Sequence, residues 1–349
     1  MKTESTAELQ NKLALQVFGK TNDIAVHSHL LKNKNGMQVE IITYGATIKS
    51  LKVPVKNGKL IDVVLGFDDL DSYIKSYDLP SAPYFGTTVG RYAGRIHKGI
   101  FSLNDKTFQL NQNNNGNALH GGFVGFGKKI WTVTDITVNE NPSITLSLVS
   151  EDSEENFPGK LQVNLTYTLT EKNELKLEYK ATTTEDTIIN LTHHSYFNLN
   201  GHDSDATDQV MFINSDKILE TTTEGVPTGE FASLTNHDFD FRTFKNCPSV
   251  IDNSFVIESK NAVAAKLFSQ KNSLEMNVYT DQPSVHVYVG GNCFTLLKGK
   301  ENIDYHPSSG ICFETQNFPD APNHKHFPNS ILKKGDEYVQ KTIYKFQSL

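Results

Sequence analysis

The sequence contains few of the residues that stabilise secreted scaffolds and membrane spans. Among its 349 residues there are 3 cysteines, Cys247, Cys293 and Cys312, which form no CxxC pair and cannot all be bridged. Sparse, unpaired cysteine is typical of a reducing compartment. Residues 1–20 lack the apolar segment of a signal peptide, and no apolar run approaches the length of a membrane span. We therefore expect a cytoplasmic protein with no membrane partner.

The chain also has no excess of positive charge. Its formal net charge is -7, whereas a partner with a phosphate backbone requires a basic face that releases counterions. Nucleic acid is therefore not expected as a partner, and an uncharged or weakly charged small molecule is. With 37% hydrophobic and 21% charged residues, the chain has enough apolar side chains for a packed core and is too balanced for a disordered protein.

Signatures of metal and nucleotide sites are absent from the sequence as well. It holds 12 histidines, but no HExxH motif and no cysteine–histidine spacing typical of zinc. His27-x-His29 and His324-x-His326 have no evident third ligand nearby. The GxxxxGK motif is missing, and no glycine-rich loop enters a helix. We therefore expect neither a metal nor a cofactor.

What the sequence has in abundance is period-two alternation. Apolar residues occupy every second position from Leu161 to Leu169, which predicts a half-buried strand. The same pattern from Leu175 to Tyr179 follows a turn at Glu171 to Asn173, so the two segments are expected to form a hairpin. Asn57-Gly58 and Asn104-Asp105 mark two further hairpins.

Other strands are expected around residues 144–148 and 285–289, whereas the one helix that the pattern supports is short, from Asp68 to Tyr77. Many short strands without a βαβ rhythm favour antiparallel sheets that pack face to face or close into a barrel. We expect an all-β chain that forms a single domain over residues 1–349, with the residues up to about Leu15 as an N-terminal extension. The sequence leaves both a monomer and a weak homodimer open.

A first block of ionisable residues lies on the polar face of an apolar segment, at residues 189–198. Strand side chains alternate between faces, so Leu191 and Phe197 can point into a core while His194 and Tyr196 point the other way. The neighbouring His193 then falls on the core side. Alternation therefore separates the two histidines and selects His194 as the candidate.

A second block, at residues 311–317, follows the same pattern. Ile311 and Phe313 require burial, which leaves Glu314 on the opposite face, where a carboxylate must find solvent or a cleft. A histidine and a glutamate could thus share one cleft. From the pattern alone, a purely structural role for His194 and for Glu314 stays open.

A charged and aromatic segment lies further along the chain. Asp238, Asp240 and Arg242 alternate with Phe239 and Phe241, which places the charges on one face above an aromatic floor. From this pattern alone, a surface ion pair is the favoured interpretation.

Four further candidate residues lie outside these segments. His120 is followed by Gly121-Gly122, where glycines allow the backbone to approach a ligand. Arg91 and Arg95 share a face if their segment is a strand, and a purely structural role for one of them stays open. Gln282 lies in a turn before the strand that begins near Val285.

Five motifs, taken in chain order, closely resemble those of the aldose 1-epimerases, also called galactose mutarotases. They are Gly90-Arg91-Tyr92-Ala93-Gly94-Arg95-Ile96, Leu119-His120-Gly121-Gly122, Asn190-Leu191-Thr192-His193-His194-Ser195-Tyr196-Phe197-Asn198-Leu199, Asp238-Phe239-Asp240-Phe241-Arg242 and Phe313-Glu314-Thr315-Gln316-Asn317-Phe318-Pro319-Asp320-Ala321. The resemblance runs from about Phe18 to the C-terminus. It implies a large antiparallel β-sandwich of the galactose mutarotase-like type, with few short helices and an open cleft for a free sugar.

The resemblance also implies an activity and roles for individual residues. The activity is the interconversion of the α and β anomers of free hexoses such as galactose and glucose, with His194 as general acid and Glu314 as general base. The residues implied to hold the sugar hydroxyls and ring oxygen are Arg95, His120, Tyr196, Asp240 and Gln282. No metal or redox cofactor is implied. Neighbouring carboxylates are expected to stabilise the His194 imidazolium, which predicts a bell-shaped pH profile.

Three positions depart from the pattern of the family. Gly94 stands where many members have asparagine, and His193 replaces an asparagine often seen before the catalytic histidine. The segment Gly290-Gly291-Asn292-Cys293 is looser than the usual Gly-Asn-Phe. None of these departures removes a proposed catalytic group. Gly94 lacks the asparagine side chain that the resemblance implies as one contact with the sugar. The resemblance therefore does not fix the preferred aldose.

Other functions remain as hypotheses at this point. A glycosidase could use Asp240 and Glu314, since hydrolysis of a glycosidic bond needs two carboxylates. A sandwich that binds a sugar without changing it is a second alternative. Activity on hexose 6-phosphates ranks lower, because the sequence shows no cluster of arginines reserved for a phosphate.

Overall fold

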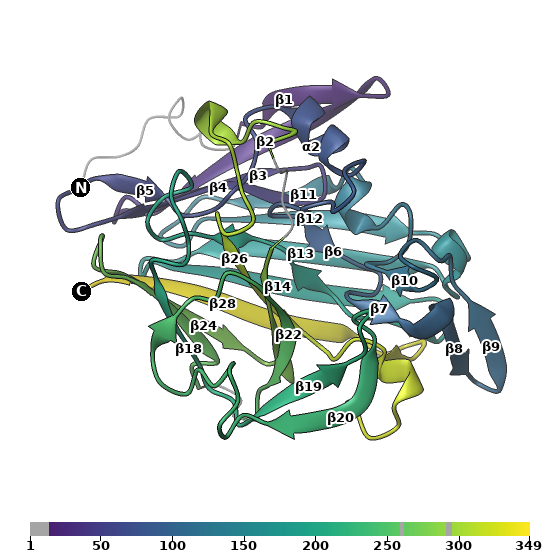
Figure 1. Cartoon of the computed structure of the whole chain (residues 1–349). Helices are drawn as coiled ribbons and strands as arrows, with labels where there is room; N and C mark the ends of the chain where they lie inside the picture. Colours follow the sequence, from purple (N-terminus) through teal and green to yellow (C-terminus); the bar gives the residue numbers. More distant parts are fainter. Residues whose placement is uncertain (1–13, 259–261, 291–294) are drawn as a thin grey trace.

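The computed structural model describes residues 14–258, 262–290 and 295–349 of the chain (Figure 1). Most of the expected N-terminal extension, and most of the segment Gly290-Gly291-Asn292-Cys293, therefore lies outside the described residues. In the described part of the chain, strands dominate and the α-helix is α2 (Leu70–Ser76). No helix within these ranges has the length and apolar character needed to cross a membrane.

The largest sheet has nine strands, and its neighbouring strands pair antiparallel. In spatial order they are β11 (Thr132–Thr137), β12 (Ser143–Ser150), β13 (Leu161–Leu169), β14 (Glu174–Thr183), β28 (Tyr338–Ser348), β24 (Leu274–Thr280), β23 (Ala265–Ser269), β18 (Val210–Ile213) and β21 (Lys245–Asn246). The C-terminal strand β28 pairs with β14 on one side and β24 on the other. The end of the chain thus joins the two halves of this sheet.

A second sheet has six strands and carries the site described below. In spatial order they are β17 (Tyr196–Phe197), β26 (Ile311–Gln316), β25 (Ser284–Val289), β22 (Ile251–Val256), β19 (Lys217–Thr221) and β20 (Pro227–Ser233). All of its neighbouring pairs are antiparallel.

Smaller sheets and single turns complete the fold. A five-stranded antiparallel sheet is formed by β1 (Gln16–Thr21), β2 (Ile24–Lys32), β3 (Gln38–Ile42), β4 (Thr47–Pro54) and β5 (Leu60–Asp62). Two-stranded pairs are β6 (Thr88–Val89) with β16 (Thr192–His193), β7 (Arg95–Ile96) with β10 (Ala118–Leu119), β8 (Ile100–Leu103) with β9 (Lys106–Gln109), and β15 (Thr187–Ile188) with β27 (Ile331–Leu332). Short 3₁₀ turns lie at His97–Gly99, Phe126–Lys128, Glu154–Asn156, Lys300–Asn302 and Ala321–Asn323.

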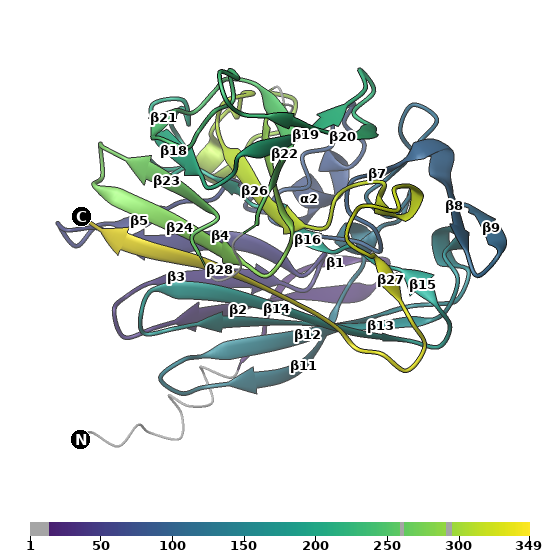
Figure 2. The same cartoon turned by 90° about the horizontal axis from the view of Figure 1, so that it is seen from below.

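The nine-stranded and six-stranded sheets pack against each other through apolar side chains. Seen from below in Figure 2, β11 to β14 lie along the lower side and β19, β20 and β22 along the upper side. The hydroxyl of Tyr344 in β28 donates to the carbonyl of Phe313 in β26 at 3.1 Å, and its ring lies 4.9 Å from that of Phe197 in β17. One buried cluster contains residues of both sheets, among them Leu165 and Val287. The predicted antiparallel β-sandwich is confirmed.

The predicted local elements are present as well. β13 and β14 form the expected hairpin, with Leu161 opposite Thr183 and Leu169 opposite Leu175. Asn57-Gly58 connects β4 to β5, and Asn104-Asp105 connects β8 to β9. These turn residues suit their places because they tolerate the left-handed backbone that tight hairpins require.

The helix lies inside the range expected for it. The side chain of Asp69 accepts a hydrogen bond from the backbone N–H of Ser72 at 2.8 Å and so caps the start of α2. The helix buries Leu70, Tyr73 and Ser76, which are spaced three residues apart and so share one face. The ring of Tyr73 packs edge-on against Phe67 at 5.1 Å.

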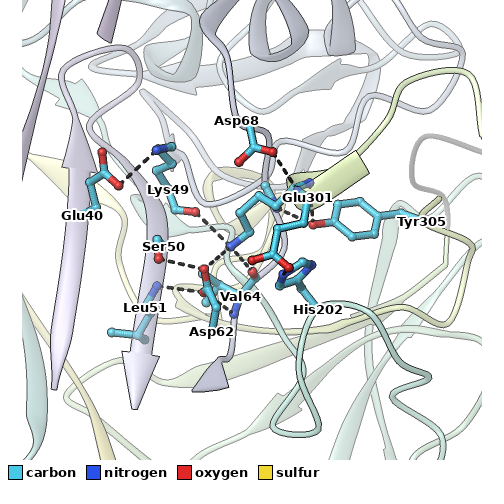
Figure 3. Close-up of polar contacts among 12 residues, drawn as sticks. Glu40, Lys49, Ser50, Leu51, Asp62, Val64, Asp68, His202, Glu301 and Tyr305 are labelled. Carbon is cyan, nitrogen blue, oxygen red and sulfur yellow. Dashed lines mark hydrogen bonds and ion pairs between the residues drawn. The ribbon is translucent and has the colours of Figure 1, made fainter. Parts of the chain in front are cut away.

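A buried ion pair fixes the segment that joins β25 to β26 (Figure 3). The Nζ of Lys300 donates to Asp62 Oδ2 at 2.8 Å and to the carbonyls of Val64 at 2.5 Å and Lys49 at 3.2 Å. Burial opposes ionisation of Asp62, but Lys300 outweighs it, with help from Ser50, and the pKa of the carboxyl stays below its usual value. Burial also lowers the pKa of Lys300. The Asp62 carboxylate and the carbonyls of Val64 and Lys49 together provide an acceptor for each of the three ammonium protons of Lys300.

This pair predicts a difference between two neighbouring lysines. Lys300→Met leaves the Asp62 carboxylate buried without its cation, which should lower the free energy of unfolding by about 3–5 kcal/mol. Lys298 pairs with Asp304 where the side chains are 52% and 48% exposed, so Lys298→Met should cost at most about 1 kcal/mol. Urea denaturation of both variants measures the difference, and equal losses would contradict a structural role for the buried pair.

Candidate active site

The described part of the chain contains a cleft with a volume of about 340 Å³. Its floor is the outer face of the six-stranded sheet, and its rim comes from loops near residues 77–84, 94–95 and 113–123. This volume lies at the lower end of what small-molecule sites occupy, so a monosaccharide is a suitable size. Of the seven residues that the sequence and the resemblance single out, the cleft brings together Arg95, His120, His194, Tyr196 and Glu314.

Strand alternation explains how the floor is built. Along β26, Ile311 and Phe313 enter the core between the sheets, and the residues between and after them face outward. The register aligns these outward residues in two rows across the sheet. One row contains Tyr196, Cys312, Tyr288 and Asp252, and the other contains Glu314, His286 and Ser254.

His194 and Glu314 meet on this floor. His194 Nε2 lies 3.5 Å from Glu314 Oε1, and the two side chains are only 6% and 3% exposed. The main chain of His194 is fixed on both sides, since its N–H donates to the Thr87 carbonyl and its own carbonyl accepts from the Gly86 N–H, both at 2.9 Å. An imidazole and a carboxylate are thus held together in a nearly dry place.

The charge state of His194 differs from the expectation drawn from the sequence. Burial lowers the pKa of His194, and the opposing effect of Glu314 does not compensate for it. The expectation considered only neighbouring carboxylates and neglected the cost of desolvating an imidazolium. Without a ligand, His194 therefore holds its extra proton weakly.

Cys312 lies on the other side of the His194 ring. Its Sγ is 3.5 Å from His194 Nδ1, and burial raises the pKa of the thiol well above its usual range. An ionised Glu314 only accepts hydrogen bonds, so the proton of a neutral His194 belongs on Nε2. Nδ1 is then bare and accepts from the thiol S–H. Cys312 is therefore a positioning residue for His194.

His120 enters the cleft from a strained loop. It has a φ of +52°, and a Cβ on the following Gly121 would lie 2.1 Å from the Gly90 carbonyl oxygen, so only glycine suits that place. The N–H of Gly94 donates to His120 Nδ1 at 3.3 Å. Burial, followed by the positive charges of His194 and Arg95, lowers the pKa of His120 well below its usual value. His120 is thus neutral and carries its proton on Nε2.

The two arginines of the first motif have separate places. Arg91 is buried, and its guanidinium donates to the carbonyls of Pro158 at 2.9 Å and Gly159 at 2.8 Å, so it holds loops together. Arg95 lines the cleft and donates to Asn114 Oδ1 at 3.1 Å. The structural role left open for one arginine therefore falls to Arg91.

Asp240 and Gln282 do not line this cleft, so the structure does not bring these two residues together with the other five. Phe241 is buried, which turns Asp240 toward the surface, where Arg242 donates to both of its oxygens at 2.9 and 2.8 Å. This is the surface ion pair that alternation alone favoured. Gln282 lies in the turn between β24 and β25, where its amide donates to Asp281 at 2.8 Å.

Sequence reasoning missed four residues of the floor, namely Asp252, Ser254, His286 and Tyr288. The signal was available, since valines at 285, 287 and 289 place His286 and Tyr288 on the opposite face of β25. The rim residue Tyr84 was missed as well. Its ring centroid lies 5.0 Å from that of His120 and 5.8 Å from that of His194, so it bridges the two imidazoles.

The departure at Gly94 has a structural explanation. Gly94 has a φ of +78°, and a Cβ there would lie 2.7 Å from the side chain of Pro319. A larger residue would need both a left-handed backbone and a shift of this proline. Gly94 therefore lines the cleft with its backbone alone and packs closely against Pro319.

One group of possible metal ligands lies in the described residues. The ligand atoms of His194, Cys312 and Glu314 lie within 4.8 Å of one another. However, Cys312 faces Nδ1 of the ring and Glu314 faces Nε2, so one ring nitrogen does not meet both. This arrangement suits proton transfer better than coordination.

Comparison with known proteins decides the family. The family model for aldose 1-epimerase matches residues 27–345. The chain belongs to the aldose 1-epimerase family. It is 39% identical to the galactose mutarotase of Bos taurus over 321 residues, 89% of this chain and 91% of that protein, and 31% identical to the aldose 1-epimerase of Escherichia coli strain K12, covering 90% and 94%.

The solved structures agree with this aldose 1-epimerase assignment. The GalM/aldose epimerase homologue from C. elegans superposes with a TM-score of 0.84 at 31% identity, covering 92% of this chain and 99% of that one. The galactose 1-epimerase from Lactobacillus acidophilus NCFM, which is 24% identical, superposes with a TM-score of 0.83 over 96% of this chain and 98% of that one and so shares the fold. The resemblance seen in the five motifs is confirmed.

The contact between Cys312 and His194 can be tested in this aldose 1-epimerase without measuring turnover. Cys312→Ala removes the thiol proton that favours a bare Nδ1, so the pKa of His194 should rise by up to about 1 pH unit, as for a lost hydrogen bond of about 1 kcal/mol. NMR chemical shifts of the ring nitrogens report both the tautomer and the titration. Cys247 is a second buried free thiol, outside the cleft, and Cys247→Ala is the control. An unchanged His194 titration in Cys312→Ala would contradict the contact.

Proposed function

We propose that this protein is an aldose 1-epimerase that interconverts the α and β anomers of free hexoses such as galactose and glucose. The observation that carries this proposal is the buried pair of His194 and Glu314, whose Nε2 and Oε1 lie 3.5 Å apart in a cleft of monosaccharide size. The relatives named galactose mutarotase and aldose 1-epimerase support the same reaction.

The reaction needs one base and one acid on opposite sides of a single bond. Glu314 takes the proton of the C1 hydroxyl, and His194 donates a proton to the ring oxygen, so that the C1–O bond to the ring oxygen breaks. The aldehyde then rotates about the bond between C1 and C2, and the ring closes on its other face by the reverse transfers. The pair holds one exchangeable proton throughout: His194 is the imidazolium and Glu314 the carboxylate before the ring opens, and His194 is neutral and Glu314 protonated while the sugar is in its open-chain form. Each positioned group supplies about 10²- to 10⁴-fold.

The remaining cleft residues are suited to hold the sugar in place. His120 offers an Nε2–H donor, Arg95 offers guanidinium donors, and Asp252 offers a carboxylate in place of Asp240. Gln316 Oε1 is buried and, among the described residues, has no hydrogen-bond partner, so a sugar hydroxyl could satisfy it. Fixing the sugar on a rigid sheet adds the benefit of orientation.

The hypothesis of a glycosidase receives less support. It required Asp240 and Glu314 to flank one bond, but Asp240 is paired with Arg242 and does not line the cleft. A purely binding function does not account for an acid and a base held together at the floor. As to location, Cys247 and Cys312 are both free, which supports a reducing, cytoplasmic compartment.

The catalytic assignment predicts the behaviour of two variants. Glu314→Gln and His194→Asn should each lower the rate of mutarotation by about 10²- to 10⁴-fold, because each removes one partner of the proton transfer. Polarimetry of freshly dissolved α-galactose and α-glucose measures the rate. The matched control is Asp240→Asn, which alters an ion pair outside the cleft and should change the rate less than twofold, roughly as a surface substitution does. Near-normal rates in either catalytic variant would sink the proposal.

A second measurement separates the epimerase from a glycosidase. The protein is expected to release no new reducing ends from galactosides or glucosides while it accelerates mutarotation of the free sugars. Comparing glucose, galactose, xylose and arabinose then tests sugar preference, which the missing side chain at Gly94 leaves to other contacts. Hydrolysis at a rate comparable to mutarotation would favour the glycosidase.

A further inference from the structure

Three residues of the floor form a chain of hydrogen bonds that the proposed proton transfer does not use. His286 Nε2 lies 2.9 Å from Asp252 Oδ1, and His286 Nδ1 lies 2.9 Å from Ser254 Oγ. Asp252 and Ser254 are two residues apart on β22, and Ser254 is directly opposite His286 on β25. The two neighbouring strands therefore fix the imidazole between a carboxylate and a hydroxyl. We call these three residues the relay.

The charge on the relay follows from what surrounds His286. Burial opposes its protonation, but the hydrogen bond and charge of Asp252 outweigh burial and raise the pKa of His286. The pKa of Asp252 is correspondingly lowered to about 2, chiefly by His286 against the effect of burial. Glu314 on β26 adds to the raised pKa of His286, whereas Arg95 on β7 opposes it. Both partners therefore favour an ion pair.

The relay is not the catalytic triad of an acyl-transfer enzyme, although it contains serine, histidine and aspartate. In such a triad, the neutral imidazole takes the proton of the serine. An imidazolium that already donates from both nitrogens cannot take it. The chemical role of the relay must therefore lie in the direction of its hydrogen bonds.

That direction depends on the proton of His286. When the ring is charged, Nδ1–H donates to Ser254 Oγ, and the hydroxyl hydrogen of Ser254 is free to point into the cleft, which Ser254 lines. When the ring is neutral and keeps its proton on Nε2 for Asp252, the bare Nδ1 accepts the hydroxyl hydrogen of Ser254. Ser254 then presents an oxygen lone pair to the cleft, whereas with a charged ring it presents its hydroxyl hydrogen.

We propose that the relay of Asp252, His286 and Ser254 switches the Ser254 hydroxyl between donating to a bound sugar and donating to His286, and so makes sugar affinity depend on pH separately from proton transfer by His194 and Glu314. This inference rests on the proposed function only in that the cleft binds a free sugar. His286 acts here through Ser254 and is a positioning residue.

The sign of the effect follows from the raised pKa. The imidazolium, and with it the donor from Ser254, is present at low pH and is lost as the pH rises through the pKa of His286, above its ordinary value of 6.5. Loss of one hydrogen bond to the sugar should weaken binding about threefold to tenfold. Tight binding is therefore expected on the acid side of this titration.

The test uses a ligand whose ring cannot open. Affinity of the full-length protein for 1,5-anhydrogalactitol is measured by calorimetry from about pH 5 to pH 9, a range that spans the histidine titration. Proton NMR of the imidazole C–H resonances follows the titration of His286 in the same samples. We expect the dissociation constant to rise with increasing pH. The midpoint of this rise should coincide with the pKa observed for His286.

Variants of the relay distinguish its parts. Ser254→Ala should weaken binding at low pH and remove the pH dependence, and His286→Gln should remove the dependence because its amide does not titrate. Asp252→Asn should move the titration of His286 to lower pH, and the change in affinity should move with it. His27→Gln, on β2 and outside the cleft, is the matched control and should behave as wild type.

Any of three outcomes would overturn the inference. One is an affinity that stays constant while His286 titrates in the wild-type protein. This measurement does not depend on whether any variant folds. A second is a pH dependence that survives in Ser254→Ala. Absence of binding at every pH would overturn it as well. Because the analogue cannot mutarotate, a protein that binds it with the predicted pH dependence but fails the polarimetry would contradict the proposed reaction and leave the relay standing.

Discussion

Burial of one face of the six-stranded sheet against the nine-stranded sheet is the constraint on which the site depends. Phe313 and Val287 must enter the core, and the contact of Tyr344 with Phe313 fixes how far β26 can slide. A shift of one residue would exchange the two faces and point Glu314 into the apolar core between the sheets. The apolar side chains therefore determine which polar ones face the sugar.

This constraint also shows what the sequence could and could not predict. Alternation selected His194 over His193, and Glu314, because each lies in a segment whose apolar neighbours face a core. The same rule would have found His286 on β25. The motif resemblance instead led to Asp240, which a nearby arginine neutralises at the surface. For Asp240 the local pattern was the better guide, because its ion-pair partner Arg242 is only two residues away in the sequence.

Other features depend on contacts that no local pattern contains. Arg91 and Arg95 look equivalent in their motif, but the first is surrounded by carbonyls of residues 150–159 and the second by the cleft. The partner of Lys300 is Asp62, more than two hundred positions away in the chain. Such pairings follow from the order of strands in the sheets, which alternation within one strand does not specify.

The charges of the three imidazoles in the cleft follow from competition between burial and the nearest charge. Burial disfavours the charged form of all three, but His286 has a carboxylate at 2.9 Å, His194 has one at 3.5 Å, and His120 has Arg95 nearby instead. Only His286 therefore has a raised pKa. A lowered pKa makes His194 a stronger acid once it is protonated, which favours donation to a ring oxygen of low basicity. The desolvation that opposes charge on His194 thus promotes the step in which the ring opens.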